Sequence, residues 1–180
     1  MAIITVVGPP GVGKSYISSQ LHERIGERFS TLIPSPVLGK SDSLISPPFD
    51  MEMLYTWAYG AVHNLPDTEE EHLYIFDGFP LPDAWVTEAK PTWTLLEKNL
   101  EVRMSFKRAA QVILLPLSWK KWKSEAIHKH YVDSERAQRM RDNYERYLAR
   151  TTIPGRRINM TSSVSNTIEE ITRDLGVVID

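Results

Sequence analysis

Cysteine and long hydrophobic runs are both missing from this 180-residue sequence. Without cysteine, disulfide bonds, thiolate zinc sites and thiol nucleophiles are excluded. The apolar run at residues 112–117 is much shorter than the roughly 20 residues that a membrane-spanning helix needs. The apolar N-terminus is interrupted at Gly8 and is too short for a secretory signal peptide. We therefore expect a cytoplasmic protein with no membrane partner.

A large excess of one sign of charge is also missing from the chain as a whole, because 21 Lys or Arg against 23 Asp or Glu give a formal net charge of only −2. The distribution is nevertheless uneven, since residues 118–157 contain eleven Lys or Arg against five Asp or Glu. This segment either faces an anionic partner or forms a solvated helix face with mixed charges. The sequence leaves both interpretations open.

Apolar segments rich in β-formers alternate with helical patterns along the chain. The expected strands are residues 3–7, 29–33, 73–76, 112–115 and 158–160. Short buried strands separated by helices predict an α/β fold with three αβα layers and a five-stranded parallel sheet. The length and the 42% hydrophobic content favour a single domain over residues 1–180. Asp50 and Asn166 are the expected N-caps of two of the helices.

A glycine-rich loop follows the first expected strand. It fits the pattern G-x-x-x-x-G-K-[ST] at every specified position, with Gly8, Pro9, Pro10, Gly11, Val12, Gly13, Lys14 and Ser15. An amphipathic helix follows, so backbone N–H groups and the positive end of that helix would point at a phosphate. We expect Lys14 to reach the β- and γ-phosphates and Ser15 to bind magnesium. The sequence therefore predicts a P-loop NTPase that binds ATP and Mg²⁺.

A carboxylate follows the expected strand at residues 73–76. Asp77 comes directly after this apolar run, and a carboxylate there is costly unless it meets a cation or hydrogen-bond donors. If this strand lies beside the first one, Asp77 approaches Ser15 and supports magnesium. The structural alternative is a turn formed by Asp77 and Gly78 that has no metal role.

Two segments resemble known kinase families. The sequence Phe76-Asp77-Gly78-Phe79-Pro80 resembles the Asp-Gly-Phe-Pro element of adenylate-kinase-type nucleoside monophosphate kinases. The C-terminal half, in which Tyr131-Val132-Asp133 opens a helix, resembles thymidylate kinases and deoxynucleoside kinases. The resemblance implies a P-loop kinase fold, with an acceptor-side insert at about residues 34–66 and a lid-like segment at about residues 118–135.

Two departures from these families affect the acceptor. Leu81 stands where adenylate-kinase-type enzymes usually carry an arginine that holds the acceptor phosphate, and Gly78 stands where thymidylate kinases carry an arginine. The layout is also similar to that of thymidylate-kinase-like bacteriophage enzymes that phosphorylate hydroxymethylated uracil within DNA. A hydroxyl acceptor in DNA is therefore an alternative to a free nucleotide, and a phage-encoded protein would act in the host cytoplasm.

The cationic segment after the fourth expected strand contains the candidate lid residues. Phosphoryl transfer needs positive groups around the migrating phosphate, and the resemblance places the lid here. We expect Lys123 and Lys129 to act on the lid, although part of the cluster is equally compatible with solvated surface. The cations held in reserve are Arg136, Arg139 and Arg141.

Two tryptophans, Trp119 and Trp122, lie among these lysines. Flat rings beside cations are typical of surfaces that stack bases and grip a phosphate backbone, which favours a polynucleotide acceptor. The alternative is that both rings pack into the core or clasp adenine.

The predicted activity is an ATP- and Mg²⁺-dependent phosphotransferase, and the resemblance implies a thymidine-like deoxynucleoside or deoxynucleotide as acceptor. A hydroxyl acceptor benefits from a carboxylate base, for which Asp77 and Asp42 are the candidates. One alternative is a DNA kinase that phosphorylates 5-hydroxymethyluracil or a strand end. Another class of protein, a P-loop switch or motor subunit that only hydrolyses NTP, is the third interpretation. The sequence does not determine the donor base, the acceptor or the oligomeric state. A dimer is one of the oligomeric states that the sequence allows.

Overall fold

A computed structural model describes residues 2–34, 47–66, 72–78, 91–129, 133–153, 155–159 and 164–175. The strands are β1 (Ala2–Val7), β2 (Ser30–Pro34), β3 (Leu73–Asp77), β4 (Ala109–Leu115) and β5 (Gly155–Asn159). The helices are α1 (Lys14–Ile25), α2 (Pro47–His63), α4 (Pro91–Phe106), α5 (Trp119–His128), α6 (Ser134–Arg150) and α7 (Val164–Leu175). Strands and helices alternate along most of the chain, as the sequence predicts.

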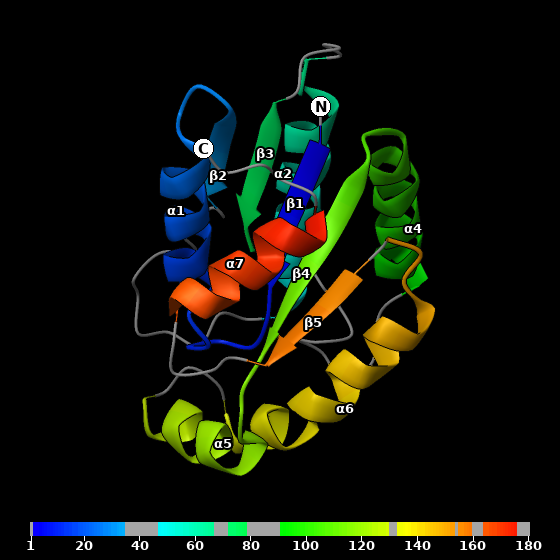
Figure 1. The fold of residues 1–180 in the computed structure, drawn as a ribbon. Coiled ribbons are helices and arrows are strands. Elements are labelled where there is room, and N and C mark those ends of the chain that lie inside the picture. Colours follow the sequence, from blue (N-terminus) through cyan, green and yellow to red (C-terminus); the bar gives the residue numbers. More distant parts are fainter. Residues whose placement is uncertain are drawn as a thin grey trace.

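The strands form one sheet in the order β2-β3-β1-β4-β5 (Figure 1). Each pairing within the described residues is parallel, and the central strand β1 pairs with β3 on one side and with β4 on the other. The predicted α/β class and parallel sheet are therefore confirmed. Because parallel strands point the same way, the segments that follow β1, β3 and β4 all leave the sheet at one edge, where ligands bind in open α/β folds.

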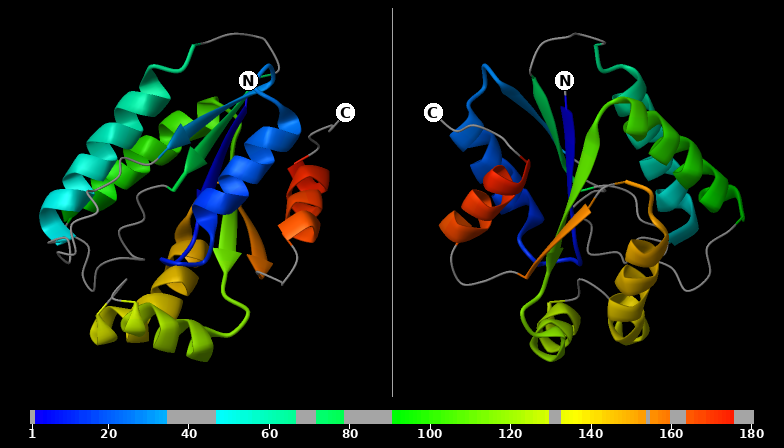
Figure 2. Two further views of the ribbon diagram at one scale, coloured as in Figure 1. Left: turned by 90° about the vertical axis from the view of Figure 1, so that its left-hand side faces the viewer. Right: turned by 45° about the vertical axis from the view of Figure 1, so that its right-hand side comes forward.

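Helices cover both faces of this sheet. Figure 2 shows α1 and α7 on one side and α2, α4 and α6 on the other. Side chains that alternate along β1 explain these layers: Ile4 and Val6 pack in the cluster that includes α1 and α7, whereas Ile3 and Val7 pack in clusters on the opposite face. No helix that the structure describes is long and apolar enough to span a membrane.

Helices α5 and α6 lie at the carboxyl edge of the sheet. Val7, Ile113 and Leu115, from the ends of β1 and β4, share a buried cluster with Trp122 of α5 and Tyr144 of α6. Burial of these large apolar and aromatic side chains stabilises the contact between the two helices and the sheet. Helix α5 is thereby placed next to the loop that follows β1 (Figure 1).

Two predicted helix starts are wrong. Helix α2 begins at Pro47, so Asp50 lies inside its first turns and not at the N-cap. Proline is favoured at the first position of a helix because it has no N–H to leave unsatisfied, which accounts for the earlier start. Helix α7 begins at Val164, so Asn166 also lies inside the helix.

Candidate functional site

The glycine-rich loop runs from the end of β1 to the start of α1, at the carboxyl edge of the sheet. Gly8 begins the loop in a position that admits no side chain, because a Cβ atom there would lie 2.5 Å from the Leu114 carbonyl oxygen and 2.8 Å from Val12 Cγ1. Gly11 and Gly13 have φ values of 75° and 98°, in the left-handed region that favours glycine. The three glycines of the motif thus let the backbone turn closely over the end of the sheet.

The N-terminus of α1 carries no compensating negative charge. Gly13 is the N-cap and supplies no side-chain hydrogen bond, and the first turn contains no acidic residue. The first helical bond runs from the Ile17 N–H to the Gly13 carbonyl at 3.0 Å, so the preceding N–H groups have no partner within the helix. Together with the positive end of the helix dipole, these groups form a site suited to an anion.

Lys14 lies at this helix start and turns back over the loop. Its Nζ atom donates a hydrogen bond to the Pro9 carbonyl oxygen at 3.1 Å. Burial lowers the pKa of Lys14 from 10.5 to about 8, and the nearby charge of Asp77 opposes part of that decrease. The Lys14 ammonium is therefore poorly solvated, and it gains more from a bound phosphate than an exposed lysine would.

Asp77 reaches the same place from β3. Its register partner in β1 is Val6, and the Gly78 N–H donates to the Val6 carbonyl at 2.9 Å. The prediction that this strand lies beside the first strand is therefore confirmed. Residues 73, 75 and 77 point to the face covered by α1, so Asp77 and the start of α1 share one side of the sheet.

Ser15 and Asp77 are the residues that could hold magnesium. Both offer oxygen ligands, which Mg²⁺ prefers, and Mg²⁺ in nucleotide sites needs few protein ligands because phosphate and water supply the others. Ser15 is an exposed residue in the first turn of α1. Asp77 is close enough to Lys14 for its negative charge to raise the pKa of the Lys14 ammonium. The donor set fits magnesium, and its binding stays a prediction.

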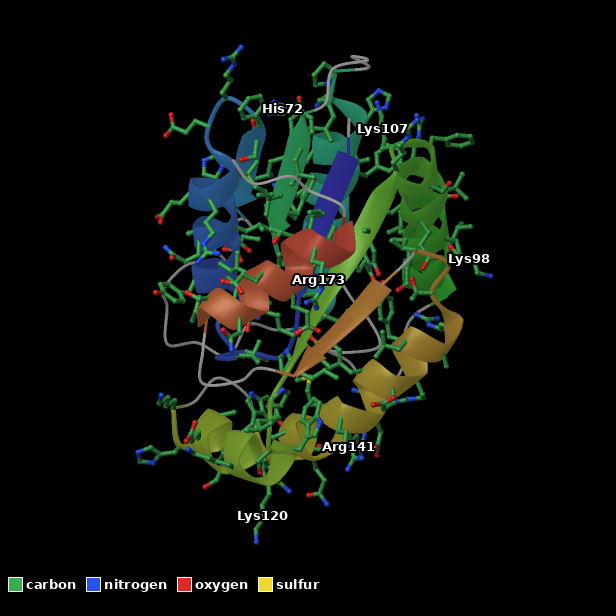
Figure 3. The ribbon with its side chains drawn as sticks, in the orientation of Figure 1. His72, Lys98, Lys107, Lys120, Arg141 and Arg173 are labelled. Atoms are coloured by element: carbon green, nitrogen blue, oxygen red, sulfur yellow. The ribbon has the colours of Figure 1, made fainter. Side chains whose placement is uncertain are left out.

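The predicted lid lysines lie on α5. Lys123 donates to the Gln138 side-chain oxygen of α6 at 3.3 Å, whereas Lys129 is exposed at the C-cap of the helix. Lys120 is exposed and points away from the rest of the protein in Figure 3. Lys121 forms an exposed ion pair with Glu125 at 3.8 Å. A role of Lys123 and Lys129 in transfer stays a prediction.

The other candidates lie elsewhere. Arg139 of α6 pairs with Glu135 of the same helix at 2.9 Å, and Arg141 is exposed on α6. Asp42, the side chain of Arg136, and Leu81 lie outside the described residues. Of the two candidate general bases, Asp42 is therefore not placed by the structure, whereas Asp77 lies near Lys14.

Two contacts to the loop were missed by the sequence reasoning. The Trp122 Nε1–H donates to the Pro10 carbonyl at 2.8 Å, and the residue is only 7% exposed. Tyr144 of α6 is hydrogen-bonded to the Gly8 backbone, and burial raises its pKa above the usual value. The buried positions Ala137, Met140 and Tyr144 of α6 repeat at helical spacing, a signal that could have identified this inward face.

A buried polar pair lies behind this aromatic cluster. Gln111 of β4 donates to the Tyr147 hydroxyl at 2.6 Å, and burial is the main cause that raises the pKa of Tyr147 to about 12. Tyr147 therefore stays neutral at physiological pH, which excludes it as a base there.

No protein-family model matches this sequence, and no curated protein matches it either. The fold, in contrast, is similar to that of solved kinases. The deoxyadenosine kinase from M. mycoides with bound dATP has a TM-score of 0.63 and 16% sequence identity, covering 97% of this chain and 99% of the other. Polyphosphate kinase 2 from Arthrobacter aurescens TC1 has a TM-score of 0.64 and 13% identity, covering 99% of this chain and 70% of the other.

A third similar structure is the YorR protein from Bacillus subtilis, solved in complex with phosphorylated GDP. It has a TM-score of 0.65 and 13% identity, covering 97% of this chain and 96% of the other. Because identity is low throughout, these similarities establish a shared fold and do not by themselves establish an activity.

Proposed function

We propose that this protein is an ATP- and Mg²⁺-dependent phosphotransferase that phosphorylates a thymidine-like deoxynucleoside or deoxynucleotide. The observation that carries the proposal is the meeting of three groups at one edge of the sheet: the uncapped start of α1, the Lys14 ammonium and the Asp77 carboxylate. An NTP-binding site needs these groups at this place, because a triphosphate requires backbone donors, a cation and a carboxylate that supports magnesium.

Each group has a distinct task in this reaction. The N–H groups around Gly13 bind phosphate oxygens, and Lys14 stabilises the charge that develops on the migrating phosphoryl group. Ser15 and Asp77 would hold Mg²⁺, which neutralises charge on the β- and γ-phosphates when bound. Burial lowers the pKa of Lys14, so its ammonium is less hydrated than that of an exposed lysine and is attracted more strongly to phosphate.

The structure favours a small acceptor over DNA in one respect. The DNA kinase interpretation depends in part on Trp119 and Trp122 as stacking surfaces, beside the basic segment and the absent acceptor-phosphate arginine. Trp122 is buried and its N–H is bonded to the loop, and Trp119 is partly buried against the same cluster. The buried Trp122 ring cannot stack on a base, so only Trp119 is left as a candidate stacking surface for DNA.

Labelled ATP with a panel of acceptors tests the proposal. The acceptors are thymidine, deoxyadenosine, thymidine monophosphate, plain duplex DNA and duplex DNA containing 5-hydroxymethyluracil. We expect label on a nucleoside or a monophosphate, loss of transfer without Mg²⁺, and loss of transfer in Lys14→Ala with the fold retained.

Each other outcome points to a different function. Label on a duplex alone would establish a DNA kinase. ATP hydrolysis that no acceptor accelerates would indicate a switch or motor subunit. Transfer by Lys14→Ala at the wild-type rate would refute the role assigned to the loop.

A further inference from the structure

Trp122 links helix α5 to the phosphate loop. Its indole Nε1–H donates to the Pro10 carbonyl oxygen at 2.8 Å. The ring is held on its other sides, because it packs with α6 in a buried cluster and the Trp119 ring meets it edge-on at 5.4 Å between centroids. The bond therefore joins a fixed side chain to a loop built mainly of glycine and proline.

The peptide unit that accepts this bond also carries the Gly11 N–H. The Pro10 carbonyl and the Gly11 N–H belong to one planar trans peptide, in which they point in opposite directions. Gly11 has φ 75°, and a glycine lets such a peptide rotate with little steric resistance. A donor that holds the carbonyl consequently determines where the Gly11 N–H points.

The loop has few other N–H groups to offer a ligand. Pro9 and Pro10 have none, the Gly8 backbone is bonded to Tyr144, and the Val12 N–H donates to the Pro9 carbonyl at 3.4 Å. Over the described part of the chain, the loop N–H groups without a protein acceptor are those of Gly11, Gly13, Lys14 and Ser15. Gly11 is the donor in this set that lies farthest from the helix, so the helix start does not orient it.

We propose that Trp122 is a positioning residue of the phosphate loop, whose indole N–H holds the Pro10–Gly11 peptide so that the Gly11 N–H meets a phosphate oxygen. This inference rests on the proposed function. It adds a role for α5 that is independent of the lysines on that helix. It also means that a shift of α5 disturbs the donor site, because the two are joined by one hydrogen bond.

Trp122→Phe tests the role of the indole, since it removes the N–H donor and keeps an aromatic ring in the core. Trp119→Phe is the matched control, because Trp119 lies on the same helix and in the same cluster. We expect calorimetry to show Mg-ATP binding about tenfold weaker in Trp122→Phe, the size of one charged hydrogen bond at its lower limit. Binding by Trp119→Phe and the KM for the acceptor should stay at wild-type values.

Nuclear magnetic resonance of the ligand-free protein separates positioning from general loosening of the core. In Trp122→Phe the Gly11 amide resonance should shift or broaden while that of Gly13, which the helix start fixes, stays in place. A measurement on the wild type does not depend on the folding of the variant: the indole proton of Trp122 should exchange slowly with solvent, and more slowly still with Mg-ATP bound.

Three results would overturn the inference: an unchanged Gly11 resonance in Trp122→Phe, equal weakening of Mg-ATP binding in both tryptophan variants, or rapid exchange of the indole proton in the wild type. Failure of the proposed function has a different signature. A wild-type protein that binds no Mg-ATP would refute the kinase proposal, and the Gly11 resonance would still report whether Trp122 orients the loop.

Discussion

Binding of Mg-ATP is expected to add a proton to Lys14 above neutral pH. In the free protein, burial lowers the pKa of this ammonium to about 8, with partial opposition from Asp77. A triphosphate brings negative charge into contact with the ammonium, which favours its charged form. The pKa of Lys14 in the complex should therefore return to about 10.4 or higher, the ordinary range for lysine.

The size of the effect follows from the two pKa values. Free Lys14 is neutral in about one tenth of the molecules at pH 7, one half at pH 8 and nine tenths at pH 9. Binding should consequently take up about 0.1, 0.5 and 0.9 proton at these three values. Because the charged form is the one that binds phosphate, the apparent Kd for Mg-ATP should weaken about tenfold from pH 7 to pH 9.

Calorimetry in two buffers with different ionisation enthalpies measures this uptake directly at each pH. The terminal phosphate of the nucleotide does not contribute, since a phosphate monoester loses its second proton near about pH 6. Lys14→Arg is the control, because arginine stays charged over the whole range, and it should bind without proton uptake. Uptake of equal size in Lys14→Arg would assign the proton to another group, and wild-type binding without uptake at pH 9 would refute the lowered pKa.

Four further substitutions test the assigned roles. Asp77→Asn should shift the magnesium titration of activity to higher concentration, and an unchanged titration would leave Asp77 as a turn residue. Lys123→Ala and Lys129→Ala should each lower kcat more than Mg-ATP affinity if they act as lid cations; equal losses in both quantities would argue against a lid. Gly8→Ala should lower the free energy of unfolding by about 1–3 kcal/mol, because a Cβ collides with backbone of β4, and chemical denaturation with a wild-type midpoint would contradict that geometry.

The glycine-rich loop and its neighbouring strand could be predicted because their sequence signals are local. The motif from Gly8 to Ser15 places glycine, lysine and serine at fixed spacing after an apolar strand. Strand β3 is also evident from its apolar run, and the chemistry of Asp77 requires a cation nearby. Once both strands are placed in a parallel sheet, the meeting of Lys14 and Asp77 follows from their shared edge.

The contacts from α5 and α6 to the loop could not be predicted in the same way. Trp122 and Pro10 are 112 residues apart, and no local spacing relates a tryptophan to the carbonyl that it will meet. The sequence suggested that Trp122 either stacks bases or is buried, and the packing of α6 against the sheet determines which occurs. The predicted start of helix α2 at Asp50 was wrong because Asp50 and Pro47 are both favourable near a helix N-terminus, and the sequence alone does not choose between them.

The same packing bears on the acceptor. Binding to a DNA backbone needs cations that are free to meet phosphates. Two of the four lysines at residues 118–135 are engaged within the protein, because Lys121 is paired with Glu125 and Lys123 is bonded to Gln138. The missing arginines at Gly78 and Leu81 count against an acceptor phosphate, but they do not distinguish a hydroxyl on DNA from a hydroxyl on a free nucleoside. A hydroxyl acceptor without a long phosphate backbone satisfies both observations, so a free deoxynucleoside is the acceptor that we expect to be labelled first.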